Sequence, residues 1–280
     1  MYKEKVSKDL LKCFNESADK EKVSNIAAEP GEYKNFTGEI KTEFVEGKVE
    51  NAIFEIKENG EVIWEKGTWY TGKWRGGDWH GGTWHDGYWN GDTWAGGTWH
   101  NGTWHGGVWH GGVWKNGTWE KGSWASGTWH NGTWEKGSWV GGTWEKGTWE
   151  NGSWASGTWH GGTWHGGVWK NGTWHNGTWK KGSWYSGTWE DGVWKRGNWH
   201  NGAWYGGTWH NGAWHNGTWY GGVWEDGYWA SGNWVGGTWE KGTWENGYWA
   251  SGIWEDGVWE SGRDKSGKVH TDSPDTWHLE

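Results

Sequence analysis

The sequence predicts an all-β repeat protein, a β-solenoid of five-residue units, and three observations favour this class. Tryptophan recurs at every fifth residue from Trp64 to Trp259, which gives 40 tryptophans without a slip in register. Glycine stands two residues before the tryptophan in 38 of the 40 units. The residue between them is threonine, valine or isoleucine in 27 units, and such β-branched residues favour strands. Repetition of this fidelity outweighs every other feature of the chain.

The unit is written here Gly–a–Trp–b–c, where a, b and c are its variable positions. Position b is the most polar one, and position c is glycine, asparagine or aspartate in 26 units, which are residues that tolerate turns. Each unit is therefore expected to be a short strand followed by a corner. Within the strand, glycine and tryptophan point to one face, and a and b point to the other.

Two architectures can be built from this unit. In a solenoid each unit is one side of a coil. In a long antiparallel meander each unit is one strand, and the frequent Asn-Gly pairs at c–Gly are hairpin turns. A three-residue strand cannot be joined to two-residue hairpin loops at both ends. The backbone groups of its first and last residues hydrogen-bond to the same neighbouring strand, whereas a meander requires them to bond to opposite neighbours. The stretch 138–156 also recurs at 233–251, an odd shift of 19 units that would reverse strand direction in a meander. Both observations favour the solenoid.

The unit GTWHN resembles that of the pentapeptide-repeat family, with tryptophan in place of the family's leucine or phenylalanine and glycine in place of its alanine. This resemblance implies a right-handed, four-sided β-helix with four units per coil, and hence about ten coils. The stretch TWYTGKWRGG (68–77) partly resembles a MORN repeat, which is the form that the meander would take. The near-invariant glycine indicates a positive φ or a very close approach of another backbone segment.

The chain divides into three parts. Residues 1–61 are expected to form an N-terminal cap, with a helix inside Ser7 to Lys22 and a β-hairpin that turns at 58–61. Residues 62–262 form the repeat. Residues 263–280 lose the pattern and form a polar C-terminal tail.

Composition limits the functions that the chain can have. The formal net charge is −9, and residues 61–262 hold 13 Lys and Arg against 18 Asp and Glu, so the repeat lacks a basic nucleic-acid footprint. Cys13 is the only cysteine, which excludes a disulfide within the chain. The N-terminal segment has no apolar core typical of a signal peptide, and no apolar run is long enough to span a membrane. A cytoplasmic location is expected, with a virus particle or leaderless export left open.

The tryptophans are expected to form a buried aromatic ladder, since 40 exposed indoles would exceed any apolar patch that a monomer tolerates. Twelve histidines all occupy position b, and in a four-unit coil His80 would lie over His100, His85 over His105 and His110 over His130. Such pairs on a convex face do not predict a metal site, which needs three or four converging ligands. The histidines are at positions 80, 85, 100, 105, 110, 130, 160, 165, 175, 200, 210 and 215.

No polar residue stands in a unique context beside a base, so an enzyme is not expected, and neither is a cofactor. The sequence favours a non-catalytic structural or protein-binding rod, which would meet a protein partner through its N-terminal cap or its surface. Two alternatives stay open: an adhesive or glycan-binding fibre segment, and a DNA mimic that inhibits a DNA-acting enzyme. Nucleic acid and membrane are not expected as partners.

Overall fold

The computed structural model describes residues 2–4, 43–56 and 61–277. The chain forms two compact units, residues 1–142 and 143–280, and each is described by itself. Among the described residues the regular elements are β-strands, apart from one short 3₁₀ helix, η2 (Pro274–Thr276). The helix expected inside Ser7 to Lys22 lies outside the described residues.

The first compact unit begins with a short strand, β1 (Tyr2–Glu4), and two long strands, β2 (Glu43–Ile56) and β3 (Val62–Arg75). β1 pairs antiparallel with β2, and β2 pairs antiparallel with β3 from Ile56–Val62 to Glu43–Arg75. β3 carries the first three units of the repeat, and β2 follows it around that turn with register shifts. β2 therefore covers a strand edge that would otherwise be open to pairing with another chain.

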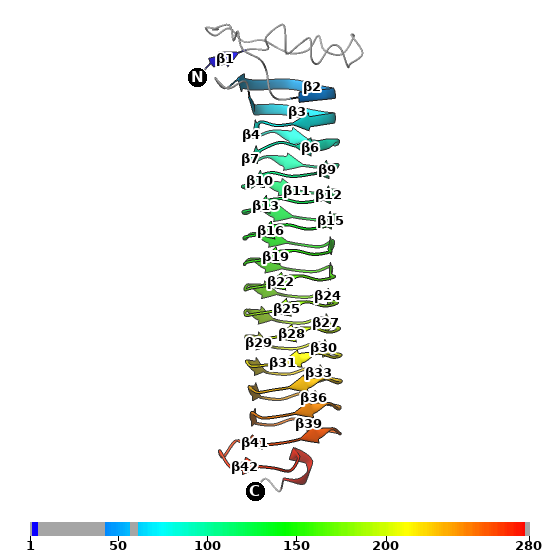
Figure 1. The fold of residues 1–280 in the computed structure, drawn as a ribbon, viewed down its shortest axis with the longest axis vertical. Helices are drawn as coiled ribbons and strands as arrows, with labels where there is room; N and C mark the ends of the chain where they lie inside the picture. Colours follow the sequence, from blue (N-terminus) through cyan, green and yellow to red (C-terminus); the bar gives the residue numbers. More distant parts are fainter. Residues whose placement is uncertain (1, 5–42, 57–60, 278–280) are drawn as a thin grey trace. The chain divides into compact units, whose positions relative to one another are not determined.

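After β3, short strands stack turn upon turn within each unit (Figure 1). The first unit contains β4 (Asp78–Trp79) to β16 (Ser138–Trp139), and the second contains β17 (Thr143–Trp144) to β40 (Val258–Trp259). Each consists of position a and the tryptophan, except β6 (Tyr88–Asn90), which is one residue longer. The last strands are β41 (Gly262–Arg263) and β42 (Val269–His270).

Strands that are three repeat units apart pair in parallel, so one turn of the solenoid consists of three units. Trp94 is the register partner of Trp109 in the first compact unit, and Trp179 is the partner of Trp194 in the second. The position-b amide donates to a tryptophan carbonyl of the preceding turn, as from Lys195 N to Trp179 O at 2.8 Å. The predicted β-solenoid of five-residue units is confirmed, and the antiparallel MORN-like alternative is wrong.

The expected four-sided coil is also wrong, because the solenoid has three sides. The first compact unit holds 16 repeat tryptophans, which make about five turns, and the second compact unit holds 24, which make eight. The four-sided coil predicted about ten turns in all. Indole size explains the difference. Trp64, Trp69 and Trp74 form a closed triangle, with ring centroids 6.2, 5.8 and 6.0 Å apart. Three indoles therefore meet at the centre of one turn, whereas four in a square would not touch along its diagonals.

The tryptophans form the core of both units, and those from Trp64 to Trp244 are 0% exposed. Each indole stacks on the equivalent indole of the next turn, as in Trp184–Trp199, at 4.7 Å and 6° between planes. It also meets the next indole along the chain edge to face, as in Trp184–Trp189, at 6.0 Å and 74°. Both geometries are favoured for aromatic pairs, and the stacking distance equals the spacing of neighbouring strands.

Ring contacts rather than side-chain hydrogen bonds hold most of these indoles. From Trp159 to Trp234 the indole N–H groups have no acceptor among the described residues. Further along, Trp239 Nε1 donates to the Asp256 carbonyl at 3.1 Å, at a corner of the next turn. The N–H edge thus points toward the corners of the coil, where carbonyl groups are within reach.

The near-invariant glycine is required by the backbone at the corner. Gly112 has a φ of 113°, and a Cβ there would lie 2.4 Å from the carbonyl oxygen of Gly97, one turn earlier. The same oxygen accepts the Val113 amide at 2.9 Å, so the strand cannot move away without losing a ladder bond. Both reasons suggested by the sequence, positive φ and close backbone approach, therefore apply.

Position c stabilises the corner in two ways. An aspartate or asparagine there accepts a hydrogen bond from the next glycine amide, as in Gly192 N to Asp191 Oδ1 at 2.7 Å. A serine instead donates to the position-b carbonyl one turn earlier, as in Ser231 Oγ to His215 O at 2.7 Å. These local side-chain bonds explain why small polar residues recur at the position.

Candidate binding site on the second unit

The outward-facing residues at position b form ladders in which neighbours belong to successive turns. The stacked histidine pairs are His85–His100, His160–His175 and His200–His215, with ring centroids 4.7, 4.7 and 5.0 Å apart. The pairs expected from a four-unit coil are therefore wrong: His80 over His100, His85 over His105 and His110 over His130. The coil closes after three units, which places these residues on different sides.

Other histidines contact a glutamate one turn away. His165 Nδ1 lies 3.5 Å from Glu150 Oε2, and His80 Nδ1 lies 3.4 Å from Glu65 Oε1. Three closer contacts of the same kind join His105 to Glu120, His175 to Glu190 and His210 to Glu225. Within the described ranges no three His, Cys, Asp or Glu side chains are grouped so that they could hold a metal ion. The ladders pair these side chains along the face and do not converge them on one point.

Two histidines in the stacked ladders have a lowered pKa. For His100 the cause is first its partial burial and then the charges of Lys115 and His85 on either side. For His200 it is partial burial and then His215. Partial burial, and after it the neighbouring cationic side chains, thus disfavour the protonated form of these two imidazoles.

The second compact unit carries a groove of about 510 Å³ on one of its sides. The strands of this side include β18 (Thr148–Trp149), β21 (Thr163–Trp164), β24, β27, β30 (Thr208–Trp209) and β33 (Val223–Trp224). We call this side the β24 face, after β24 (Thr178–Trp179), and the hollow the cationic groove. Four of its seven lining side chains are cations, although the whole chain is acidic. The seven are Glu150, His165, Thr178, Lys180, Lys181, Lys195 and Arg196.

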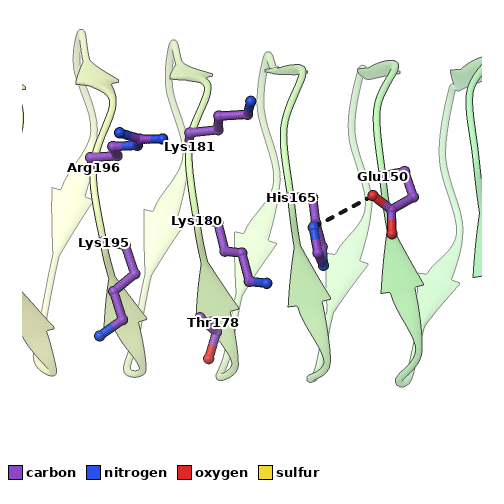
Figure 2. A pocket seen from close by; sticks show the side chains of 7 residues that line it. All are labelled: Glu150, His165, Thr178, Lys180, Lys181, Lys195 and Arg196. Carbon is purple, nitrogen blue, oxygen red and sulfur yellow. Dashed lines mark ion pairs between the residues drawn. The ribbon is translucent and has the colours of Figure 1, made fainter.

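The repeat places these cations in a two-by-two array. Lys180 and Lys195 occupy position b on successive turns, because β24 pairs with β27 (Val193–Trp194). Lys181 and Arg196 occupy position c of the same two turns, at the corner (Figure 2). Strands in such a ladder lie about 4.8 Å apart, so the backbone positions of the four cations are close together.

A histidine and then a carboxylate follow the lysines on both sides along the β24 face. On one side His165 contacts Glu150 (Figure 2). On the other, Lys195 Nζ donates to His210 Nε2 at 3.0 Å, and His210 Nδ1 contacts Glu225. A proton on Nδ1 of His210 satisfies both contacts, since Nε2 then accepts and Nδ1 donates. The six rungs from Glu150 to Glu225 thus read acid, His, Lys, Lys, His, acid.

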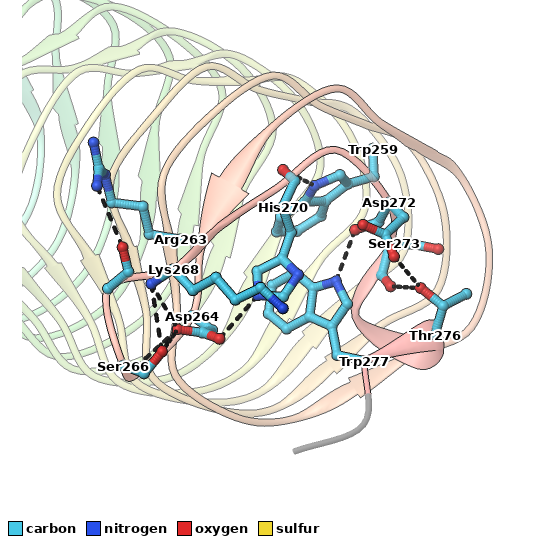
Figure 3. Close-up of polar contacts among 11 residues, drawn as sticks. Trp259, Arg263, Asp264, Ser266, Lys268, His270, Asp272, Ser273, Thr276 and Trp277 are labelled. Atoms are coloured by element: carbon cyan, nitrogen blue, oxygen red, sulfur yellow. Dashed lines mark hydrogen bonds and ion pairs between the residues drawn. The ribbon is translucent and has the colours of Figure 1, made fainter. Parts of the chain in front are cut away.

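The C-terminal end of the second unit is closed by a polar turn (Figure 3). Asp264 stands five residues after Trp259, in the slot of the next tryptophan, and is 5% exposed. Its carboxylate accepts from the Ser266 hydroxyl at 2.6 Å and pairs with His270 Nε2 at 2.8 Å. These two bonds, in that order, hold the pKa of Asp264 far below its usual range.

Trp277 completes this closure. Its ring stacks on His270 at 4.0 Å and meets Trp259 edge to face at 5.2 Å. A pocket of about 210 Å³ remains beside Trp254, Pro274 and Trp277. The last indoles of the ladder are therefore mostly covered, with Trp254 and Trp259 only 8% and 9% exposed.

The cationic groove is not evident from the sequence alone. The sequence does contain a pair of cations, at 180 and 181, that recurs three repeat units later at 195 and 196. This spacing makes the two pairs neighbours only if three repeat units form one turn. In a four-unit coil the two pairs would lie on different sides.

The chain matches no protein-family model, no curated protein and no solved structure. In the part of the chain that the structure describes, no helix has the length and apolar character needed to cross a bilayer.

Proposed function

We propose that the protein is a non-catalytic scaffold that binds a protein partner through one of its three outer sides. The observation that supports this most directly is the division of labour within the repeat. The tryptophans are buried, while position b presents one side chain per turn along each side at regular spacing. Stacked repeats of this kind offer extended surfaces whose chemistry can vary without any change in the core.

The geometry favours this function over glycan binding by stacking. The exposed aromatic side chains at position b stack on one another, as in Tyr205–Tyr220 at 4.7 Å and 8°. One face of each ring is therefore covered by the other ring, whereas a sugar stacks on a free ring face. Mixed charges on one side, such as Glu150 and Lys180 of the β24 face, also differ from the uniform negative charge of a DNA mimic.

Three variants of the full chain, one for each outer side, test the proposal. Each replaces four position-b residues on consecutive turns by serine and leaves every glycine and tryptophan in place. The three sets are 165, 180, 195 and 210; 170, 185, 200 and 215; and 175, 190, 205 and 220. Circular dichroism and tryptophan emission should stay as in the wild type, because the core is unchanged.

Cross-linking mass spectrometry in cells of the source organism then provides the measurement. We expect one variant to lose a defined set of cross-links to a partner while the other two keep it. Identical cross-links in all three variants would contradict binding through a side of the solenoid. Retention of the cross-links in all three variants but not in a chain lacking residues 1–61 would place the contact on the N-terminal segment instead.

A further inference from the structure

The cations of the groove lack carboxylate partners. Among the described residues no carboxylate lies within ion-pair distance of Lys180, Lys181, Lys195 or Arg196, and the polar contact of Lys195 is with the His210 imidazole. The two glutamates of the β24 face nearest in the ladder, Glu150 and Glu225, are each two turns from a lysine and contact histidines. Asp191 lies at the corner where the strand of Lys195 begins, and its Oδ1 accepts the Gly192 amide.

This arrangement is unfavourable in the protein alone. Like charges on directly opposed residues of neighbouring strands destabilise a sheet, and here two such pairs are adjacent. The first compact unit contains a pair of stacked lysines with which the groove can be compared. Lys121 and Lys136 also occupy position c on successive turns, but Glu120 and Glu135 stand beside them at position b. In that pair the residues at position b are therefore acids, whereas at the groove position b holds lysines as well.

We propose that the cationic groove binds a compact ligand carrying phosphate or sulfate groups. Lysine and arginine side chains from two successive turns can surround a tetrahedral oxyanion, and the planar guanidinium of Arg196 can donate to two of its oxygens. The Thr178 hydroxyl lines the same hollow and adds a neutral donor. A volume of about 510 Å³ lies within the ordinary range for small-molecule sites.

The flanking acids limit the length of the ligand. A chain of negative charges that ran along the β24 face would meet Glu150 on one side and Glu225 on the other. The ligand's charge must therefore fit within about two turns, as two linked phosphates do, and a long polyanion is disfavoured. This inference goes beyond the scaffold function and does not depend on it.

Titration of the purified full chain with pyrophosphate tests the proposal. At constant low ionic strength, isothermal calorimetry should show saturable binding at one site per chain. Lys180→Gln with Lys195→Gln should weaken it at least about tenfold, which corresponds to about 1.4 kcal/mol. The matched control, Lys121→Gln with Lys136→Gln, removes the same charge from acid-flanked positions and should change the affinity less than about twofold. Equal weakening by both variants, or no saturable binding to the wild type, would overturn the proposal.

Parallel titrations distinguish the sources of the oxyanion. Inorganic sulfate that binds as well as inorganic phosphate would indicate a site for any tetrahedral dianion, whereas a clear preference for phosphate would assign phosphorylated ligands. Both results support the site. A long sulfated oligosaccharide that binds more tightly than pyrophosphate would overturn the restriction to compact ligands.

A charge reversal separates ligand binding from folding. Lys195→Glu places a carboxylate opposite Lys180, so without added anion its melting temperature should be above that of the wild type at low salt. Pyrophosphate should raise the melting temperature of the wild type and leave this variant unchanged. A variant that melts below the wild type in the absence of anion, or one that pyrophosphate still stabilises, would contradict the inference.

Discussion

Substitution of Gly112 by alanine tests how the corner glycine limits the fold. A Cβ at this position lies 2.4 Å from the Gly97 carbonyl oxygen and 2.9 Å from the Gly97 nitrogen, both backbone atoms one turn earlier. The φ of 113° is also one that alanine rarely adopts. Neither conflict can be relieved by a side-chain rotation, so the backbone itself must shift.

The expected cost follows from these two conflicts. A side chain forced into a left-handed conformation costs roughly 1–2 kcal/mol. Displacement of the Gly97 carbonyl weakens the hydrogen bond from Val113, which contributes about 1 kcal/mol. Strain passed on to the stacked indoles adds to this sum. We expect Gly112→Ala to lower the free energy of unfolding by about 3 kcal/mol.

The preceding residue provides a matched control. Gly111 is a position-c glycine outside the positive-φ group, and a Cβ there would lie 3.7 Å from Ser126 Oγ, an ordinary contact. Gly111→Ala should therefore change stability little, or raise it by about 0.5 kcal/mol because it restricts the unfolded chain. Urea unfolding followed by tryptophan emission measures both variants. If Gly112→Ala is within about 0.5 kcal/mol of Gly111→Ala, the reasoning is refuted.

Three further predictions concern the core and the histidine ladder. The native tryptophan emission should be blue-shifted and poorly quenched by acrylamide, because the ladder is buried, and an emission maximum like that of free tryptophan would contradict the buried core. Trp189→Ala should cost about 3–5 kcal/mol in urea unfolding, because it leaves a cavity between two stacked neighbours and two edge contacts; a loss below about 1 kcal/mol would mean that the ladder relaxes freely. The pKa of His100 is lowered in the folded protein by burial, Lys115 and His85, so the unfolded state binds its proton at higher pH. The contribution of His100 to stability should therefore be complete above about pH 6.5 and decline as the pH falls below it. Thermal melts from pH 7.5 to 5 should show a smaller decline for His100→Gln than for the wild type, and equal declines would contradict the assignment.

Much of the fold could be predicted from the repeat itself. The five-residue register predicted that the tryptophans form the core, and the absence of alanine or serine at the glycine position indicated a positive φ or a close backbone approach, both of which Gly112 shows. These features depend on neighbouring residues within one unit. The number of units per turn does not, because it is set by how three indoles such as Trp64, Trp69 and Trp74 fill the cross-section.

The candidate site could not be predicted, because it depends on that closure. Lys180 and Lys195 are separated by three units and become neighbours only in a three-sided coil. The closed C-terminal end was missed for a different reason. The sequence marks residues 263–280 as polar, but a buried Asp264 in the tryptophan slot becomes evident only when Ser266 and His270 are seen to satisfy its carboxylate.

Paired cysteines test the three-sided coil most directly. Asn101 and Asn116 stand at position c on successive turns, and their side chains are hydrogen bonded at 3.3 Å. In a chain whose own Cys13 is replaced by serine, Asn101→Cys with Asn116→Cys should form a disulfide on mild oxidation, because parallel neighbours are within the required Cα separation of about 4.4–6.8 Å. Asn101→Cys with Lys121→Cys, which are four units apart, lie on different sides and should stay reduced. Mass spectrometry of the oxidised proteins gives the answer: a disulfide in the three-unit pair alone is the predicted result, and one in the four-unit pair alone would contradict three units per turn.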